Sequence, residues 1–341
     1  MRTWGDVEMK KWMRLIAGFL LVTLLLALVF FGRDFPIGME DLSYTHHPYL
    51  SASSRAEGEI FVDSGGDCYT ITDDQELLRQ REKLVIAEKV VRADCNSQGI
   101  VWLNTSGELY LYSNAKSVLL ADRVGEFAVS KDSICYLRKD GELYVRTPEK
   151  TGFIFDCPTD EYPSLNPNSI ELLVNDRWIF ISGIDMLEDC YYDRVEERFV
   201  VMEGPPYFEA MNDTAFLWGD NLLCLMGCAN GGMIYHLADG TGQPIDLGFA
   251  ASECNVRSSA IILDDVLYLS VQYDPWPQFR DLPIQEATYA VDADTLAFRR
   301  IDNTFYKQLV VAQGKILCVD SIVKDSFRFI RELGEINPKD Q

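Results

Sequence analysis

The chain alternates between short apolar segments and polar turns, and one such unit recurs along most of its length. Residues 100–112 read IVWLNTSGELYLY, and residues 134–146 read ICYLRKDGELYVR. Each segment is an apolar strand, a polar turn with a glycine (Gly107 or Gly141), and a second strand that begins Glu-Leu-Tyr. Glycine supplies the positive φ that a tight hairpin turn needs. The pattern therefore predicts two equivalent β-hairpins.

Five further segments fit the same hairpin less closely: residues 59–71, 178–193, 222–237, 266–291 and 316–330. In residues 59–71 the turn and second-strand positions are Gly66 and Tyr69, and in residues 222–237 they are Gly232 and Tyr235. The second-strand aromatic residues are then Tyr69, Tyr110, Tyr144, Tyr191, Tyr235, Tyr289 and Phe329. We expect these side chains to pack between neighbouring units; the alternative is a ring of aromatics that lines a ligand channel.

A hairpin with room for flanking strands, repeated about every 40 residues, is typical of β-propeller blades. Each four-stranded blade has two apolar faces and becomes stable when neighbouring blades cover both. A β-sandwich would have fewer strands and no such period. One segment, residues 74–83 (DQELLRQREK), has a more helical pattern. We predict an all-β chain with a β-propeller over residues 55–335 and a short tail at 336–341, with seven blades favoured over six or eight.

The N-terminal region contains a long apolar run. Residues 15–31 carry no charge and are flanked by Arg14 and Arg33; with Trp12 and Met13 the run approaches the roughly 20 residues that cross a hydrocarbon core. Basic residues are more numerous before the run than after it, which places the N-terminus in the cytoplasm. The alternatives are a cleaved signal peptide, whose apolar region is usually shorter, and a buried helix.

The predicted organisation is that of a single-pass protein of the cell membrane with an extracytoplasmic domain. It comprises a cytoplasmic tail (residues 1–12), a transmembrane signal-anchor helix in the lipid bilayer (13–32), and a linker or first edge strand (33–54) before the propeller.

Charge and cysteine content narrow the class of protein. The chain has 53 Asp and Glu against 31 Lys and Arg, a net charge of −22, which excludes a nucleic-acid partner because such proteins need a cationic surface. There are nine cysteines, and Cys135, Cys224 and Cys318 lie inside apolar strand-like runs. We expect mostly free thiols that behave as small apolar side chains, with one disulfide in a loop as an alternative.

Known catalytic and cofactor motifs are missing from the sequence. There is no nucleophile elbow, no paired cysteines at zinc spacing, no twelve-residue calcium loop and no phosphate-binding glycine loop. Of the three histidines, His46 and His47 fall in the predicted linker and His236 in a strand. We therefore predict no catalytic residue, no metal site and no cofactor.

Residues 288–296 (TYAVDADTL) resemble the repeat of PQQ-type propellers, whose blades carry a Tyr-Ala-Leu-Asp-Ala-x-Thr-Gly run. The Gly-x-Leu-Tyr segments at 107–110 and 141–144 fit the preceding strand, whereas Leu296 stands where that repeat has Gly. The chain is also similar to membrane-anchored bacterial propeller proteins with such repeats. The resemblance implies a propeller fold; it does not imply the quinone, because most such propellers lack it.

Two long connections carry aromatic residues that loops seldom expose. They are residues 272–283 (QYDPWPQFRDLP), in the turn of the sixth hairpin, and residues 204–208 (GPPYF). We predict a contact face for an unknown protein or glycan, formed by Tyr273, Trp276, Phe279, Arg280, Tyr207 and Phe208. The alternative is a private cover over one blade. The expected function is a non-catalytic binding or assembly-scaffold module; the alternative is a carbohydrate-active hydrolase or lyase with carboxylates in an axial pocket.

Overall fold

The computed structural model describes residues 50–51, 60–63, 65–156, 171–182, 190–201, 214–225, 231–249, 254–264, 266–275, 283–292, 295–312, 314–323 and 326–333. The predicted cytoplasmic tail, the anchor helix and nearly all of the linker lie outside them. Within these ranges every regular element is a β-strand. A search of the same ranges finds no helix with the length and apolar character that a membrane span requires.

The strands form seven antiparallel sheets, numbered here in chain order. Sheet 1 contains β2 (Ile60–Val62), β3 (Cys68–Ile71), β4 (Leu77–Arg79) and β5 (Leu84–Ala87). Sheet 2 contains β6 (Val90–Asn96), β7 (Gly99–Asn104), β8 (Leu109–Ser113) and β9 (Lys116–Ala121). Sheet 3 contains β10 (Val124–Val129), β11 (Ile134–Arg138), β12 (Glu142–Arg146) and β13 (Thr151–Asp156).

Sheet 4 contains β14 (Glu171–Val174), β15 (Trp178–Ser182), β16 (Cys190–Asp193) and β17 (Arg198–Val201). Sheet 5 contains β18 (Thr214–Trp218), β19 (Asn221–Leu225), β20 (Gly231–His236) and β21 (Thr241–Asp246), and β1 (Leu50–Ser51) pairs with β18 as a fifth strand. Sheet 6 contains β22 (Cys254–Leu263), β23 (Val266–Pro275), β24 (Gln285–Val291) and β25 (Phe298–Asp302). Sheet 7 contains β26 (Gln308–Ala312), β27 (Lys315–Val323) and β28 (Ser326–Glu332).

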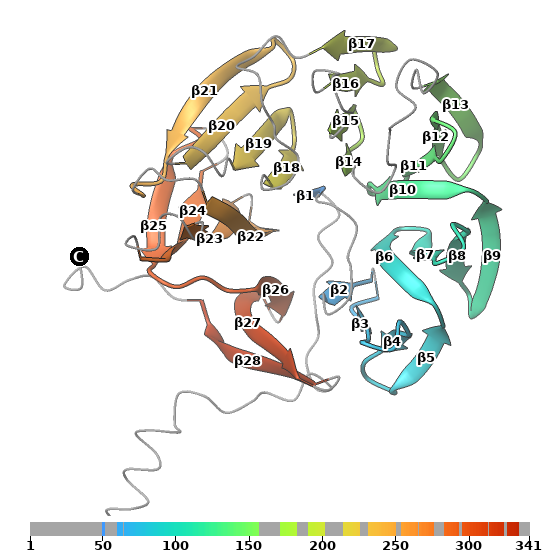
Figure 1. The fold of residues 1–341 in the computed structure, drawn as a ribbon, viewed down its shortest axis with the longest axis horizontal. Helices are drawn as coiled ribbons and strands as arrows, with labels where there is room; N and C mark the ends of the chain where they lie inside the picture. Colours follow the sequence, from blue (N-terminus) through green and yellow to red (C-terminus); the bar gives the residue numbers. More distant parts are fainter. Residues whose placement is uncertain are drawn as a thin grey trace, which may run out of the picture.

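The sheets stand around a central axis in chain order, each with its first strand at the centre and its last strand at the rim (Figure 1). Six of them have at least four strands, and the seventh has three. This arrangement confirms the all-β propeller predicted from the repeats and is consistent with six or seven blades.

The core consists of apolar layers between neighbouring sheets. Along β7, Val101 belongs to the apolar layer that includes Phe127 and Ile134 of sheet 3, whereas its neighbour Trp102 belongs to the layer toward sheet 1. Successive side chains of a strand point to opposite faces, so each sheet supplies apolar groups to two layers. No sheet can bury its apolar surface alone, which is why the sequence repeats.

Four of the repeat aromatic residues occupy equivalent places. Tyr110, Tyr144, Tyr235 and Tyr289 lie on the third strand of sheets 2, 3, 5 and 6, and each contributes to the apolar layer against the preceding sheet. Phe329 lies on β28, the third strand of sheet 7.

Two of the predicted repeat positions differ from the others. Tyr69 lies on β3, the second strand of sheet 1, so its hairpin is one strand out of register with the rest. Tyr191 faces sheet 5, and it is Tyr192 that packs toward the preceding sheet 3. A shift of one residue in a strand moves the side chain to the other face. The equivalent aromatic of sheet 4 is therefore Tyr192.

Residues 74–83, with their helical pattern, form a hairpin instead. β4 begins at Leu77, and the chain turns through residues 80–83 into β5. Leu77 is fully buried, against Val90 and Ala93 of sheet 2. Packing of this strand against its neighbour overrides the local preference for helix.

Candidate functional site

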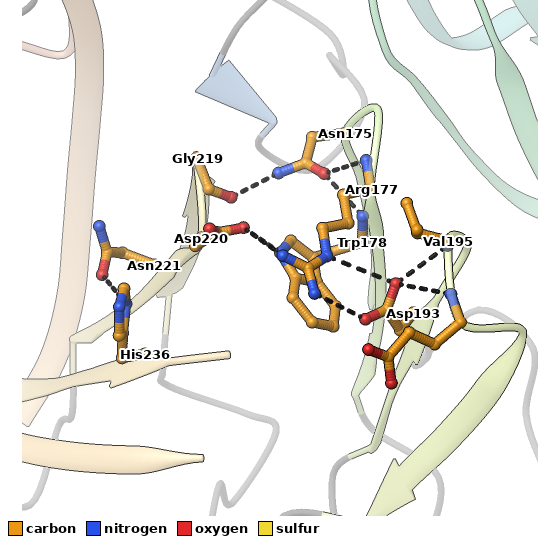
Figure 2. A network of polar contacts seen from close by, with 10 residues as sticks. Asn175, Arg177, Trp178, Asp193, Val195, Gly219, Asp220, Asn221 and His236 are labelled. Carbon is orange, nitrogen blue, oxygen red and sulfur yellow. Dashed lines mark hydrogen bonds and ion pairs between the residues drawn. The ribbon is translucent and has the colours of Figure 1, made fainter. Parts of the chain in front are cut away.

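The hairpin turns of sheets 4 and 5 meet on one face of the ring, close to the axis. In sheet 4 the turn between β14 and β15 contains Asn175, Asp176 and Arg177, and in sheet 5 the turn between β18 and β19 contains Gly219 and Asp220. Asn175 Nδ2 donates a hydrogen bond of 2.7 Å to the carbonyl oxygen of Gly219 (Figure 2). The two turns are thereby held side by side.

The side chain of Asn175 also shapes its own turn. Its Oδ1 accepts hydrogen bonds from the backbone amides of Arg177, at 2.9 Å, and Trp178, at 2.7 Å. Asparagine favours turns because its side chain can replace a backbone acceptor in this way. Asn175 therefore fixes the backbone positions of Arg177 and Trp178 in this turn.

Arg177 is held between two carboxylates and an aromatic ring. Its Nη2 donates to Asp193 Oδ2 at 3.0 Å, and its Nη1 lies 3.7 Å from Asp220 Oδ1. The guanidinium carbon lies 4.3 Å from the centre of the Trp178 ring, a cation–π contact. A planar, permanently charged group is thus fixed at the surface of the turn (Figure 2).

Asp193 is the buried counter-ion of this arginine, with a fully buried side chain. Its Oδ1 also accepts hydrogen bonds from the backbone amides of Val195, at 2.9 Å, and Glu196, at 3.3 Å. Burial by itself would raise the pKa of Asp193, but the hydrogen bonds from Arg177 and the two amides hold this pKa below its usual value. The carboxylate stays ionised and is suited to anchoring Arg177 rather than to donating a proton.

Trp178 connects the same turn to sheet 5. The side chain is 1% exposed, and Nε1 donates a hydrogen bond of 2.7 Å to Asp220 Oδ1. A buried indole normally places its N–H against an acceptor, and here the acceptor belongs to the neighbouring sheet. Asp220 is consequently fixed by groups from sheet 4.

A hollow of about 360 Å³ opens where these turns meet. It is lined by Ser130 and Lys131 of sheet 3, by Asn175, Asp176 and Arg177 of sheet 4, and by Trp218, Gly219 and Asp220 of sheet 5. A small ligand or a few side chains of a partner fit such a volume. The lining offers one partly buried indole, two cations and two carboxylates. This combination suits a ligand that has both charged or polar groups and an apolar part.

Among the described residues, no group of three or more His, Cys, Asp or Glu side chains is placed so that it could hold a metal ion. His236 is exposed, and its Nδ1 lies 3.0 Å from Asn221 Oδ1 (Figure 2).

Of the contact residues predicted from sequence, the structure describes Tyr273 alone. Trp276, Phe279, Arg280, Tyr207 and Phe208 are outside the described residues. Tyr273 was expected in a loop, but it belongs to β23 and is 1% exposed.

Tyr273 is buried because β22 and β23 are ten residues long and remain paired beyond the length of the other hairpins. The Tyr273 hydroxyl donates to the carbonyl oxygen of Gly231, and its ring packs edge-on against Phe249 at 5.1 Å. Tyr273 therefore joins sheet 6 to sheet 5 and is not available to a partner.

The hollow belongs to one face of the ring. In each antiparallel sheet the turns after the first and third strands lie on one face, and the other connections lie on the opposite face. The hollow uses turns of the first kind. Sequence reasoning missed the hollow because Asn, Asp and Gly between two strands read as ordinary turn residues.

No protein-family model matches the chain, and neither does any curated protein. Among solved structures, BamB from Moraxella catarrhalis matches with a TM-score of 0.47 and 10% identity, covering 78% of this chain and 82% of that one. U3-55K matches with a TM-score of 0.49 and 8% identity, covering 85% of this chain and 99% of that one. The extracellular domain of the putative one component system BT4673 from B. thetaiotaomicron matches with a TM-score of 0.46 and 14% identity, covering 87% of this chain and 40% of that one. At such identities the likeness concerns the fold alone.

Proposed function

We propose that this propeller is a non-catalytic binding module that holds a segment of a partner protein in the hollow between sheets 3, 4 and 5. The observation that carries the proposal is the fixed Arg177, which is anchored by Asp193, stacked on Trp178 and placed beside the hollow. Binding sites gain affinity when their polar groups are already held in the bound geometry. Arginine and tryptophan are also the residue types that dominate protein–protein contacts.

The buried carboxylate behind the hollow favours binding over catalysis. A hydrolase needs a carboxyl that can donate a proton near neutral pH. Asp193 has a lowered pKa, and Asp220 accepts the Trp178 N–H while lying 3.7 Å from Arg177. Asp193 is thus engaged with groups that stabilise its charged form.

A panel of immobilised peptides and oligosaccharides tests the proposal, with the full-length chain as the analyte and with product analysis of every positive spot. The informative variants are Lys131→Ala and Asp176→Ala, because both residues are exposed and line the hollow. The matched controls are Lys139→Ala and Asp140→Ala, exposed residues of the same types in a turn of the opposite face. We expect peptide binding without turnover that the hollow variants weaken and the controls do not. Binding that only the controls weaken would overturn the proposal.

A carbohydrate-active hydrolase or lyase is the second candidate, because Asp176 and Asp220 both line the hollow. In that case an oligosaccharide on the panel would be cleaved, and Asp176→Asn would abolish the cleavage without changing the melting temperature.

We also propose that the ring is a seven-bladed propeller with sheet 7 as its last blade, anchored with its N-terminus in the cytoplasm by residues 13–32. The uncharged run at 15–31 and the basic residues before it support the anchor. Carbonate extraction of membranes and protease protection of sealed vesicles test it. Release of the intact chain from membranes by carbonate would contradict the anchor. A protease-protection pattern that places the propeller on the cytoplasmic side would contradict the orientation.

A further inference from the structure

The inner edge of β18 carries a strand that comes from far away in the sequence. β1 pairs with β18 in antiparallel fashion, with Leu50 opposite Trp218 and Ser51 opposite Leu217. Among the described strands, no other sheet has such an addition at its inner edge. β1 lies near the centre of the ring, and it is the pale blue strand beside Gly219 in the close view (Figures 1 and 2). The chain that precedes the propeller therefore joins the ring at its axis, at sheet 5.

The register of this pairing gives the direction of the chain. Because the two strands are antiparallel, the residues before Leu50 run past the end of β18, where Gly219 and Asp220 follow. β18 ends at Trp218 and turns there into β19, and Trp218, Gly219 and Asp220 all line the hollow. The pairing thus directs the segment before β1 to the hollow.

We propose that residues 46–49 of this chain occupy the hollow and that a partner segment must displace them to bind. The inference rests on the proposed binding function and adds the regulation of that same site. Space is available over the turn of sheet 5. A Cβ added at Gly219, where φ is 58°, would have no atom of the described residues within 4 Å.

The sequence of the segment, His46-His47-Pro48-Tyr49, suits this position. Pro48 has no backbone N–H, so it ends the pairing with β18 close to the point where β18 itself ends. It also restricts His47 to an extended backbone, which reduces the entropy that the segment loses when it binds. An imidazole N–H can donate to the exposed carboxylate of Asp176, and the ring of Tyr49 provides the apolar part that the lining accommodates.

The covalent connection makes even a weak contact effective. A segment joined to its site by a short link has an effective concentration on the order of 1 mM. With an intrinsic dissociation constant of about 0.1 mM, it would fill the hollow about nine-tenths of the time. A competing peptide would then bind about tenfold more weakly than it binds to the empty hollow.

Photo-crosslinking in the full-length chain tests where the segment lies. Benzoylphenylalanine in place of Tyr49 should attach to residues 175–177 or 218–220, which mass spectrometry of proteolytic fragments identifies. The same probe in place of Phe35, elsewhere in the predicted linker, is the matched control and should not select these turns. If position 49 gives no crosslink to the two turns, or if both positions give equal yields there, the inference is wrong.

A binding experiment tests the regulation. Residues 46–49 are replaced by Gly-Ser-Gly-Ser in the full-length chain, and a synthetic peptide with the sequence of residues 44–51 is the probe. The peptide should bind the replaced chain about tenfold more tightly than the unaltered chain. In the replaced chain Asp176→Ala should weaken this binding, whereas Asp140→Ala, in a turn of the opposite face, should not. Equal affinity for the replaced and unaltered chains would overturn the inference.

The two proposals fail in different ways. If peptides of the panel bind at the hollow equally well with and without the replacement, residues 46–49 do not compete, and this inference is wrong while the proposed function stands. If the crosslinks and the probe peptide place residues 46–49 in the hollow but no peptide of the panel binds the replaced chain, the proposed partner binding fails. The assignment of residues 46–49 to the hollow then stands.

Discussion

Gln75 in sheet 1 stands at the same structural position as Gly107 in sheet 2. The amide of Val90 donates a 2.8 Å hydrogen bond to the carbonyl oxygen of Gln75, and the amide of Val124 donates one of 2.8 Å to the carbonyl oxygen of Gly107. Both residues have positive φ, 62° for Gln75 and 80° for Gly107. The true counterpart of Gly107-Glu-Leu-Tyr is therefore Gln75-Glu-Leu-Leu.

The first prediction concerns this strained turn. Gln75→Gly should raise the free energy of unfolding by about 0.5–1 kcal/mol. An L-residue at positive φ costs about 1–2 kcal/mol, which glycine avoids. The larger chain entropy that glycine loses on folding offsets only part of this gain. Urea unfolding followed by circular dichroism measures the change. The reverse substitution, Gly107→Ala, is the comparison and should destabilise, because the added Cβ would lie 3.1 Å from the Val124 carbonyl oxygen. Equal effects of both substitutions would contradict the equivalence.

The second prediction concerns the close packing of β20 against β19. A Cβ at Gly232 would lie 2.0 Å from the backbone carbonyl oxygen of Cys224, so Gly232→Ala must displace the chain. We expect a loss of about 3 kcal/mol or more. Gly152→Ala in β13 is the control, since its Cβ would meet the Val145 carbonyl oxygen at 3.9 Å, an ordinary contact. Thermal unfolding should separate the two variants by many degrees, and similar melting temperatures would refute the tight approach.

The hairpins of sheets 2 and 3 could be predicted from sequence because both carry the same Gly-Glu-Leu-Tyr run. Sheet 1 could not, because the residue at positive φ is Gln75, while Gly66 lies in the preceding turn and drew the assignment there. Sheet 4 was misread because Tyr191 and Tyr192 are adjacent, and only packing tells which one faces sheet 3. A repeat pattern therefore predicts where the hairpins are better than it predicts which face of the sheet a side chain occupies. A shift of one residue along a strand is enough to exchange the two faces.

Leu296 shows how a departure from the repeat is accommodated. It keeps a positive φ of 54° where the PQQ-type repeat has glycine. Asp292 Oδ1 accepts hydrogen bonds of 2.8 Å from both the amide and the hydroxyl of Thr295, which closes the turn and holds the strained residue. The Asp and Thr of the repeat therefore maintain this turn even without the glycine.

The hollow could not be predicted because its contacts join turns that are distant in sequence. The Trp178 and Asp220 side chains that meet there are 42 residues apart, and Asn175 and Gly219 are 44 apart. Each turn alone is unremarkable, and only the ring brings them together.

The third prediction tests whether Arg177 acts through its shape as well as its charge. Arg177→Lys keeps the cation but loses the planar fork that reaches Asp193 through Nη2 and Nε, at 3.0 and 3.4 Å, and that stacks on Trp178. We expect a loss of about 1 kcal/mol in urea unfolding. Arg123→Lys is the control, because Arg123 is 61% exposed and pairs with Asp140 at the surface. Loss of the same size in both variants would contradict the role of the fork.

The fourth prediction concerns the acid stability that Asp193 provides. Its pKa in the folded protein is lowered, so its contribution to stability is complete above the unfolded-state pKa of about 3.9 and disappears as the pH falls through the lower folded-state value. Asp193→Asn should therefore cost about 1–3 kcal/mol at neutral pH, because Arg177 loses its charged partner while the amides of Val195 and Glu196 keep an acceptor.

The gap between wild type and Asp193→Asn should stay constant from pH 7 to about 5 and then narrow as the pH falls below about 4. Urea unfolding at several pH values measures it. Asp176→Asn serves as the control, because Asp176 is exposed in the turn that carries Arg177, and this variant should follow the wild type throughout. If this difference in the free energy of unfolding instead grew toward acid pH, the effect of burial on the pKa of Asp193 would outweigh that of its hydrogen bonds. The folded protein would then favour the neutral form of Asp193. The ionised carboxylate would then no longer account for the fixed position of Arg177 beside the hollow.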